Sequence, residues 1–332
     1  MGAAKLNAEG ARMQAPHLVL GIGELLWDIL PAGPQPTGAP AAEPVALLGG
    51  ASANFTAMAG RLGNHAVLLS RIGRDDLGRR AIQQLDGMSV DTSLVEIDPA
   101  HETGRVTVEF VNDEPRYTIH EPAAWDFLSL SDEWVRLAER ADAICFGSLA
   151  QRSTQSRQTI QTLAAETPSR CIRVFDVNLR PPYVSGEIVQ ESLELASVVK
   201  MNQAELPQVL ALLGFESSES SGGDALRQGA KRLLRSFPGL RLVAITRGAK
   251  GSLLVSNEEW DEHPGFALTV ADSIGAGDAF TAALTHYLLR GAPLRRLNEA
   301  GNRWGAWVAS QSGAMPALPG EVRDAIAAAI EQ

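Results

Sequence analysis

The segment DSIGAGDAFTAALTHYLLRG, Asp272 to Gly291, places a glycine-containing turn directly in front of an amphipathic helix. Apolar side chains recur at helical spacing from about Ala276 to Arg290, and Gly291 is a typical helix terminator. Free backbone amides at such a helix start, together with the helix dipole, favour an anion. An acid, Asp278, nevertheless lies in the first turn. The segment therefore predicts an anion site that also presents a carboxylate, which suits group transfer better than simple phosphate binding.

Upstream of this turn, short apolar runs alternate with helical patterns. We expect buried strands over 18–22, 66–70, 143–146, 172–176, 197–200 and 242–246, and helices over 52–62, 153–166 and 225–235. This alternation predicts an α/β fold, a doubly wound and mostly parallel sheet covered by helices on both faces. Such sheets bind ligands at the carboxyl ends of their strands, so the loops there are the candidate site.

Two segments interrupt this rhythm. Residues 31–44 are rich in Pro, Ala and Gly, and residues 103–120 alternate in the manner of a hairpin with NDEP at its turn. They predict a small, discontinuous β lid from about 31–47 and 101–121. The small and polar residues 1–16 predict a disordered N-terminal extension, which leaves 17–332 as one domain.

Composition excludes several classes of protein. The 332 residues include 29 Lys and Arg against 39 Asp and Glu, with no long basic run, which argues against nucleic acid or an anionic membrane as partner. The two cysteines, Cys145 and Cys171, lie in apolar runs and are expected to be buried, reduced thiols. No secretory signal or membrane-length apolar stretch is recognisable, so we expect a soluble cytoplasmic protein.

Two nucleotide motifs can be set aside. GIGELL, from Gly21, has Leu26 where a dinucleotide fingerprint needs its third glycine, and no G-x-x-x-x-G-K-[ST] sequence occurs.

In LLGGASANF, two glycines precede Ser52, a candidate N-cap, and this turn would let a ligand approach the backbone. Asn54 then offers an amide to a ligand hydroxyl, and Asp28, which follows the first strand, is either a solvated turn residue or a hydroxyl acceptor.

Three further loops follow strands. In FDVNLRPPYV, turn chemistry accounts for Asp176 and Asn178, whereas a guanidinium from Arg180 suits a phosphate or carboxylate. In KMNQAELP, Asn202 and Glu205 have the spacing of a capping box. The sequence TRGAKG predicts a hairpin that needs no further function.

Taken in order, these motifs resemble the ribokinase-like sugar kinases, also called the pfkB carbohydrate kinases, over most of the chain. GGASANFTAMAGRLG is similar to the N-terminal signature of the family. DSIGAGDAF is similar to its C-terminal signature, with Ser273 and Ile274 where Thr is common. NQAE matches the N-x-x-E motif, and TRGAKG resembles the T-x-G-x-x-G nucleotide loop.

The resemblance implies a kinase domain that transfers the γ-phosphoryl group of MgATP to a sugar hydroxyl. Asp278 would be the base, and backbone amides would form the anion hole for the transferred group. The implied catalytic residues are Asp278, Gly275, Ala276, Gly277 and Arg180. The implied sugar-binding residues are Asp28, Gly49, Gly50, Asn54, Arg116, Asn178 and Asp278.

The resemblance also implies ATP and ion sites and a closing lid. The implied nucleotide-binding residues are Asn202, Glu205, Thr246, Arg247, Gly248, Gly251, Gly277 and Asn302. Asn202 and Glu205 would organise Mg²⁺ through water. A monovalent cation such as K⁺ would be held by Asp272, Ile274, Val308 and Gly313. Lids of this kind often pair between subunits, so a homodimer through the β lid is expected.

The acceptor sugar is the least determined feature. GELLWDILP, DVNLRPPYV and EPAAWD are most similar to the fructokinase branch, which implies conversion of fructose to fructose 6-phosphate. A 2-keto-3-deoxygluconate kinase is the nearest alternative, with Arg116 and Arg180 facing the substrate carboxylate. A ribokinase, a nucleoside kinase and a sugar-sensing pseudokinase without turnover also stay open. The intact set of Asp278, the glycine loop and Glu205 disfavours the pseudokinase.

Overall fold

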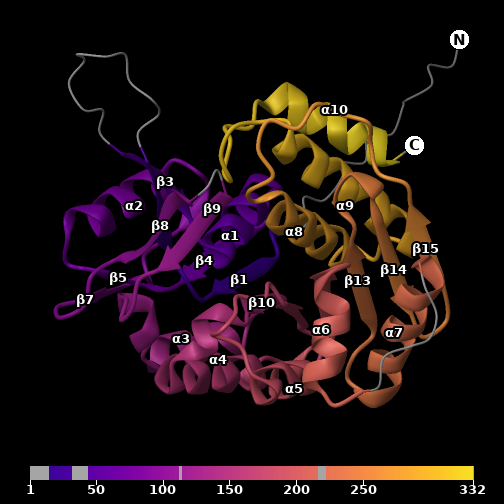
Figure 1. Ribbon diagram of the computed structural model, residues 1–332, viewed down its shortest axis with the longest axis horizontal. Helices are drawn as coiled ribbons and strands as arrows, with labels where there is room; N and C mark the ends of the chain where they lie inside the picture. The colour runs from indigo at the N-terminus through magenta and orange to yellow at the C-terminus, as the bar shows by residue number, and fades with distance from the viewer. Residues whose placement is uncertain (1–14, 32–43, 112–113, 216–221, 332) are drawn as a thin grey trace, which may run out of the picture.

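A nine-stranded sheet forms the middle layer of the fold in the computed structural model, which describes residues 15–31, 44–111, 114–215 and 222–331 (Figure 1). The strand order is β15-β14-β13-β12-β11-β10-β1-β4-β6. Neighbours from β6 to β13 run parallel, and β14 and β15 add an antiparallel edge. The bounds are β1 Leu18–Ile22, β4 His65–Leu69, β6 Val90–Asp91, β10 Ala143–Gly147, β11 Ile172–Asp176, β12 Val198–Asn202, β13 Leu242–Thr246, β14 Ser252–Ser256 and β15 Trp260–His263.

Helices cover both faces of this sheet. Because side chains alternate along a strand, Leu20 of β1 packs into one apolar cluster and Val19 into the other. The first cluster includes α3 Asp132–Ala138, α4 Thr154–Glu166, α5 Gly186–Leu195, α6 Glu205–Leu212 and α7 Gly222–Ser236. The second includes α1 Ala51–Arg61, α8 Ala276–Leu288, α9 Leu294–Ala309 and α10 Gly320–Glu331. The predicted three-layer α/β/α architecture is confirmed.

A separate four-stranded sheet has the order β3-β2-β8-β9, with bounds β2 Leu26–Leu30, β3 Val45–Gly49, β8 Gly104–Val111 and β9 Glu114–Ile119. The predicted hairpin is present, since β8 and β9 pair antiparallel. The expected lid bounds were incomplete, because β2 also belongs to this sheet through its pairing with β3 and β8. Residues 32–43 and 112–113 of the expected lid, and residues 1–14 of the expected N-terminal extension, lie outside the described residues.

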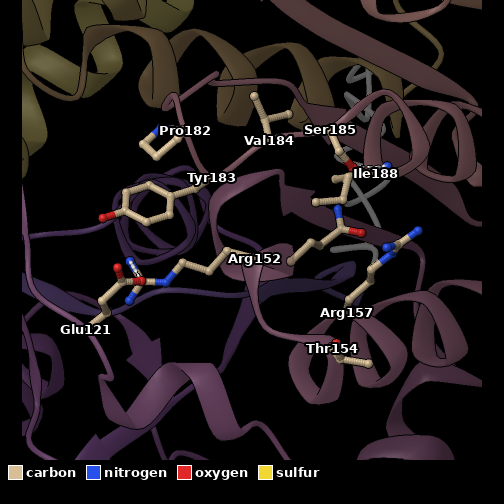
Figure 2. A pocket seen from close by; sticks show the side chains of 10 residues that line it. Glu121, Arg152, Thr154, Arg157, Pro182, Tyr183, Val184, Ser185 and Ile188 are labelled. Atoms are coloured by element: carbon tan, nitrogen blue, oxygen red, sulfur yellow. Dashed lines mark hydrogen bonds and ion pairs between the residues drawn. The ribbon is translucent and has the colours of Figure 1, made fainter.

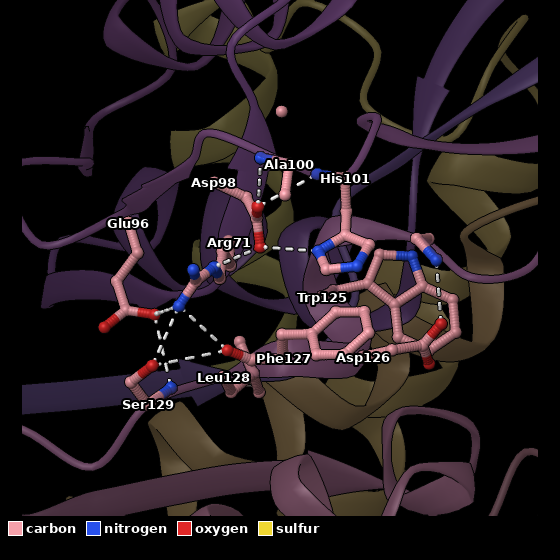
Figure 3. A network of polar contacts seen from close by, with 12 residues as sticks. Arg71, Glu96, Asp98, Ala100, His101, Trp125, Asp126, Phe127, Leu128 and Ser129 are labelled. Carbon is pink, nitrogen blue, oxygen red and sulfur yellow. Dashed lines mark hydrogen bonds and ion pairs between the residues drawn. The ribbon is translucent and has the colours of Figure 1, made fainter.

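A polar network holds the segment that leads into this second sheet (Figure 3). Arg71, in β5 Arg71–Gly73, donates to Asp98 at 2.8 Å, at the end of β7 Glu96–Asp98, and to the Phe127 carbonyl at 2.9 Å. Asp98 also accepts the backbone N–H groups of Ala100 and His101. These charge-assisted bonds fix the segment that leads into β8, and α2 Asp76–Asp86 packs beside it.

The two cysteines and the apolar character of the helices bear on two further expectations. Cys145 and Cys171 are both buried free thiols, as predicted. In the part of the chain that the structure describes, no helix combines the length and apolar composition that a membrane crossing requires.

Candidate functional site

The first turns of α1 and α8 meet through one side-chain hydrogen bond. Asn54 Nδ2 donates to Asp278 Oδ2 at 2.7 Å. Asn54 is buried, and α1 has no side-chain cap hydrogen bond. The bond brings together two residues that the resemblance assigned to the sugar site and to catalysis. It also holds the Asp278 carboxylate at the N-terminus of α8, as the sequence predicted.

Several groups set the charge state of Asp278. Burial is the largest cause that raises its pKa, to about 6, and the negative charge of Asp176 adds to the rise. Lys200, the Asn54 hydrogen bond and Arg180 act in the opposite direction. A carboxylate with a pKa near 6 is ionised at neutral pH and still able to take up a proton, which is the requirement for a general base.

The turn before α8 depends on glycine. Gly275 has φ 77° in the left-handed region, and a Cβ there would lie 2.6 Å from the Ala314 carbonyl oxygen. The Ala276 N–H makes only a long bond, 3.4 Å, to the Ser273 carbonyl. Backbone amides at this helix start therefore remain available to an anion.

A buried ion pair lies beneath this turn. Lys200 Nζ contacts Asp176 Oδ1 at 3.0 Å and Oδ2 at 3.1 Å, and Thr281 Oγ1 of α8 donates to Asp176 at 2.8 Å. A Cβ at Gly277 would lie 2.9 Å from Lys200 Nζ. The turn role expected for Asp176 was wrong, because Asp176 ends β11 and faces the ammonium that lies in neighbouring β12. Its place beside a lysine, at the carboxyl edge of adjacent strands, is the signal that the sequence reading missed.

Asp28 lies in a strand of the second sheet rather than in a turn. Its carboxylate lies over Gly49 of β3, where a Cβ would approach Asp28 Oδ2 to 2.8 Å. Burial raises the pKa of Asp28 to about 6, Arg180 lowers it, and Asp272 raises it. Asp28 therefore shares its electrostatic surroundings with Arg180 of the loop after β11 and with Asp272 of the segment before α8.

The turn between β3 and α1 also requires glycine. Gly50 has φ 103°, and a Cβ there would lie 2.5 Å from the Glu24 carbonyl oxygen. Ser52 is not the helix cap that the sequence suggested, since Gly50 takes the N-cap position and Ser52 Oγ donates to the Ile22 carbonyl at 3.0 Å. The buried hydroxyl thereby ties α1 to the end of β1.

Glu24 is a buried acid that sequence reasoning did not single out. Its side chain is 2% exposed, and Oε1 accepts the Ala51 N–H at 3.0 Å. Burial raises the pKa of Glu24 to about 7, and the charge on Asp278 adds to the rise. Its place in the loop after β1, at the carboxyl edge of the sheet, was the available signal.

The loop after β11 is linked to the start of α6. Glu205 Oε1 accepts the Leu179 N–H at 2.9 Å and Oε2 accepts the Asn202 N–H at 2.7 Å, while Asn202 Oδ1 accepts the Glu205 N–H at 3.0 Å. The predicted reciprocal hydrogen bonds are present, but Asn202 is not the N-cap as expected, because α6 begins at Glu205 and Ala204 takes the N-cap position. Asn178 has φ 38°, and Arg180 is exposed and acts on the pKa of both Asp28 and Asp278.

The hairpin that carries TRGAKG lies at the antiparallel edge of the sheet. Gly248 and Gly251 have φ values of 58° and 79°, and the pairing of β13 with β14 confirms the predicted hairpin. Thr246 ends β13 and is half-buried. The guanidinium of Arg247 donates to the His263 carbonyl at 3.0 Å and pairs with Glu262, so it is directed toward β15.

Asn302 lies inside the packing of α9 against β14. Its Nδ2 donates to Ser252 Oγ at 2.6 Å and to the Asn298 carbonyl at 2.8 Å. The side chain is 8% exposed. Asn302 therefore supports the packing of α9 against β14 through its hydrogen bond to Ser252.

The residues expected to hold a monovalent cation converge in part. Asp272 accepts the Ile274 N–H at 3.0 Å and the Gly313 N–H at 3.2 Å, and its own N–H donates to the Ala309 carbonyl beside Val308. Among the residues that the structure describes, no group of three or more His, Cys, Asp or Glu side chains is arranged to hold a metal ion.

A cavity of about 350 Å³ opens beside the loop after β11 (Figure 2). Arg152, Tyr183 and Ser185 are among its lining residues, and none of the predicted site residues lines it. Arg152 bonds Asp126 through two nitrogens at 2.8 Å and stacks on Trp125 at 4.0 Å. Arg116 lies in β9, and its side chain is outside the described part of the structure.

Comparison with known proteins gives consistent matches. Residues 17–320 match the model of the pfkB family of carbohydrate kinases. A protein described as an uncharacterized sugar kinase from Pyrococcus horikoshii is 31% identical over 80% of this chain and 82% of its own. Its structure in complex with ATP has a TM-score of 0.74, with 29% identity, and covers 90% of this chain and 94% of its own.

Two further structures were determined with acceptor molecules. A fructokinase from Vibrio cholerae, with fructose, ADP and calcium bound, has 27% identity and a TM-score of 0.76 over 93% of this chain and 98% of its own. An aminoimidazole riboside kinase from Salmonella enterica, complexed with aminoimidazole riboside and an ATP analog, has 26% identity and a TM-score of 0.73. That match covers 95% of this chain and 100% of the other.

Proposed function

The chain belongs to the pfkB family of carbohydrate kinases, and on this premise we propose that it phosphorylates fructose with MgATP to give fructose 6-phosphate and ADP. It is a phosphotransferase that acts on a sugar. The observation that carries the proposal is the Asn54–Asp278 hydrogen bond of 2.7 Å, which presents a carboxylate beside the amides at the start of α8. An acceptor hydroxyl and a phosphoryl group can meet at this point.

Asp278 takes the proton of the sugar hydroxyl in the proposed reaction. The hydroxyl oxygen forms a bond to the γ-phosphorus as the bond from the γ-phosphorus to the bridging oxygen breaks, and ADP leaves with that electron pair. Amides of Gly275, Ala276 and Gly277 stabilise the charge on the transferred group, with Arg180 beside it. The raised pKa of Asp278, about 6, supports its role as base.

Groups from both sheets hold the sugar in this proposal. The carboxylate of Asp28 and the amides of Asn54 and Asn178 accept or donate hydrogen bonds to hydroxyls, and the Gly49–Gly50 turn lets the ring approach the backbone. The close packing of Asp28 over Gly49 supports a shared site. Closure of the β lid over the sugar would exclude water, a competing phosphoryl acceptor.

The nucleotide site is proposed to include Thr246, Gly248 and Gly251, with Asn302 and Arg247 in supporting positions. Mg²⁺ would be organised by Asn202 and Glu205 through water. The donor set fits this, since each Glu205 oxygen already accepts one backbone N–H and retains acceptor capacity for water. When bound, Mg²⁺ neutralises charge on the ATP phosphates.

A monovalent cation such as K⁺ is proposed at Asp272 with carbonyl oxygens of Ile274, Val308 and Gly313. The contacts of Asp272 with the backbone of Ile274 and Gly313 support this assignment. Turnover in KCl should therefore exceed turnover in tetramethylammonium chloride at equal ionic strength. Equal rates in the two salts would remove the cation from the proposal.

Similarity to fructokinases from several organisms supports fructose as the acceptor. The Salmonella enterica match makes a nucleoside-type acceptor the competing choice. A coupled assay of ADP release over fructose, ribose, 2-keto-3-deoxygluconate and nucleosides tests the choice, with Asp278→Asn as the inactive control. The highest kcat/KM should belong to fructose. ATP turnover with none of them would favour a sugar sensor.

Pairing of two chains through the second sheet is also proposed. Val45 on edge strand β3 is 51% exposed, and Tyr117 on edge strand β9 is 61% exposed. Exposed strand edges and apolar side chains favour pairing with another chain. Light scattering of wild type and Tyr117→Glu tests this, and a monomeric wild type would contradict it.

A further inference from the structure

Among the residues that the structure describes, two buried side-chain oxygens beside the proposed base have no hydrogen-bond partner. They are Glu24 Oε2 and Asn54 Oδ1. A buried polar atom without a partner costs about 1–3 kcal/mol, so each one requires an explanation. Neither a carboxylate oxygen nor an amide oxygen can donate, and two such acceptors cannot satisfy each other without a proton.

Both side chains lie at the first turn of α1, Asn54 as part of it and Glu24 as a contact from the loop after β1. Glu24 Oε1 accepts the N–H of Ala51 at 3.0 Å, and Asn54 lies three residues further along the helix. Residues three apart lie on the same side of a helix. The Glu24 backbone also packs against Gly50, the N-cap. The Glu24 carboxyl group is thus held next to the turn that carries Asn54.

We propose that Glu24 carries a proton on Oε2 and donates it in a hydrogen bond to Asn54 Oδ1, so that the Asn54 amide is fixed with its NH₂ group toward Asp278. Glu24 is then a positioning residue for the base. The proposal rests on the role of Asp278 in the proposed function. It accounts for both unpartnered oxygens with one proton.

The alternative charge state has a definite consequence. An ionised Glu24 could only accept, so the amide of Asn54 would turn its NH₂ toward Glu24 and its oxygen toward Asp278. Asp278 would lose the 2.7 Å hydrogen bond and would face an acceptor oxygen instead. The proton on Glu24 therefore decides whether the base is held in place.

The charges around Glu24 favour a neutral acid below about pH 7. Burial raises its pKa to about 7 and Asp278 of α8 adds to this, whereas its own N–H, the Ala51 N–H and Arg180 lower it. Cys145 of β10 also faces this cluster, and burial keeps its thiol protonated by raising its pKa. As pH rises through about 7, Glu24 releases its proton and the amide loses its fixed orientation.

The test compares Glu24→Gln with Glu24→Met in the full-length enzyme. A glutamine can accept the Ala51 N–H and donate to Asn54 at every pH, whereas methionine can do neither. We expect Glu24→Gln to match wild-type kcat at pH 6, where Glu24 is mostly protonated, and to lose the decline in rate that wild type shows as pH rises through about 7. We expect Glu24→Met to lose about tenfold in kcat. Glu139→Gln, a change at the exposed C-cap residue of α3, is the matched control.

A second readout reports the proton directly. The infrared difference spectrum of wild type minus Glu24→Gln should contain a protonated carboxyl band at pH 6 that disappears above pH 8. A band absent at pH 6, or a decline in rate that persists unchanged in Glu24→Gln, would overturn the inference. If Asp278→Asn also turned over normally, the proposed function would fail with it. If Asp278→Asn were inactive, only the positioning role of Glu24 would be contradicted, and the proposed function would stand.

Discussion

Asn54 and Asp278, 224 residues apart in sequence, are joined by a 2.7 Å hydrogen bond between the first turns of two helices. Helix α1 follows the glycine turn after β3, and α8 follows the glycine turn that comes after β15 in the chain. The bond therefore joins the N-terminal and C-terminal signatures of a carbohydrate kinase into one site. Its geometry leads to four predictions.

Replacement of Asp278 by Asn should remove the base and leave the fold intact. Because the amide cannot take up the hydroxyl proton, kcat should fall on the order of a thousandfold. ATP affinity should change little, since the backbone amides of the turn are retained. Steady-state kinetics and calorimetric ATP titration measure the two effects. Turnover near the wild-type rate would exclude Asp278 as the base.

Replacement of Asn54 by Leu should shift the pH dependence of the reaction. The Asn54 hydrogen bond lowers the pKa of Asp278, so its loss should raise that pKa above its present value of about 6. An acid with a higher pKa is ionised only at higher pH, and the rising limb of kcat/KM should move toward alkaline pH. A profile of kcat/KM from pH 5 to 8 measures the shift. A rising limb that stayed in place would separate Asn54 from the charge state of the base.

Replacement of Lys200 by Met should destabilise the protein through Asp176. The pair is buried, with a separation of 3.0 Å, so removal of the ammonium leaves an uncompensated carboxylate. Such a change costs about 3–5 kcal/mol in the free energy of unfolding. Urea denaturation measures it, and the double variant Lys200→Met with Asp176→Leu should recover much of the loss. Equal instability of the single and double variants would contradict the ion-pair explanation.

Glu24 should make the stability of the fold depend on pH. Its pKa is about 7 in the folded protein against 4.5 for an ordinary glutamic acid, so the folded state holds a proton that the unfolded chain releases. This contribution to stability is fully present below pH 4.5 and is lost as pH rises to about 7. The loss is on the order of 3 kcal/mol.

Urea denaturation of wild type and Glu24→Gln at pH 5 and pH 8 isolates the contribution of Glu24 to the free energy of unfolding, because the other titrating groups are common to both proteins. Wild type should lose more stability than the variant between the two pH values. The control Glu139→Gln should follow wild type. Parallel losses in wild type and Glu24→Gln would place the pKa of Glu24 near its ordinary value.

Local patterns in the sequence were sufficient for most of the fold. Apolar runs located the parallel strands except β6, helical periodicity located α1, α4, α7 and α8, and alternation located the β8–β9 hairpin. Glycine turns and Asp278 marked the carboxyl edge of the sheet as the candidate site. These features depend on interactions between residues that are close in sequence, so the composition and residue spacing of a short segment predict them.

Tertiary structure decided which polar groups share that site. The sequence determined that a carboxylate stands at a glycine-rich helix start, but not that Asn54 holds it, that Lys200 and Asp176 pair beneath it, or that Glu24 is buried beside it. It also left open whether Asp28 is a solvated turn residue or a hydroxyl acceptor, whereas strand pairing places Asp28 in the second sheet. The physical reason is that burial and charge come from side chains far apart in sequence, which only the packing of α1 and α8 over the sheet brings together.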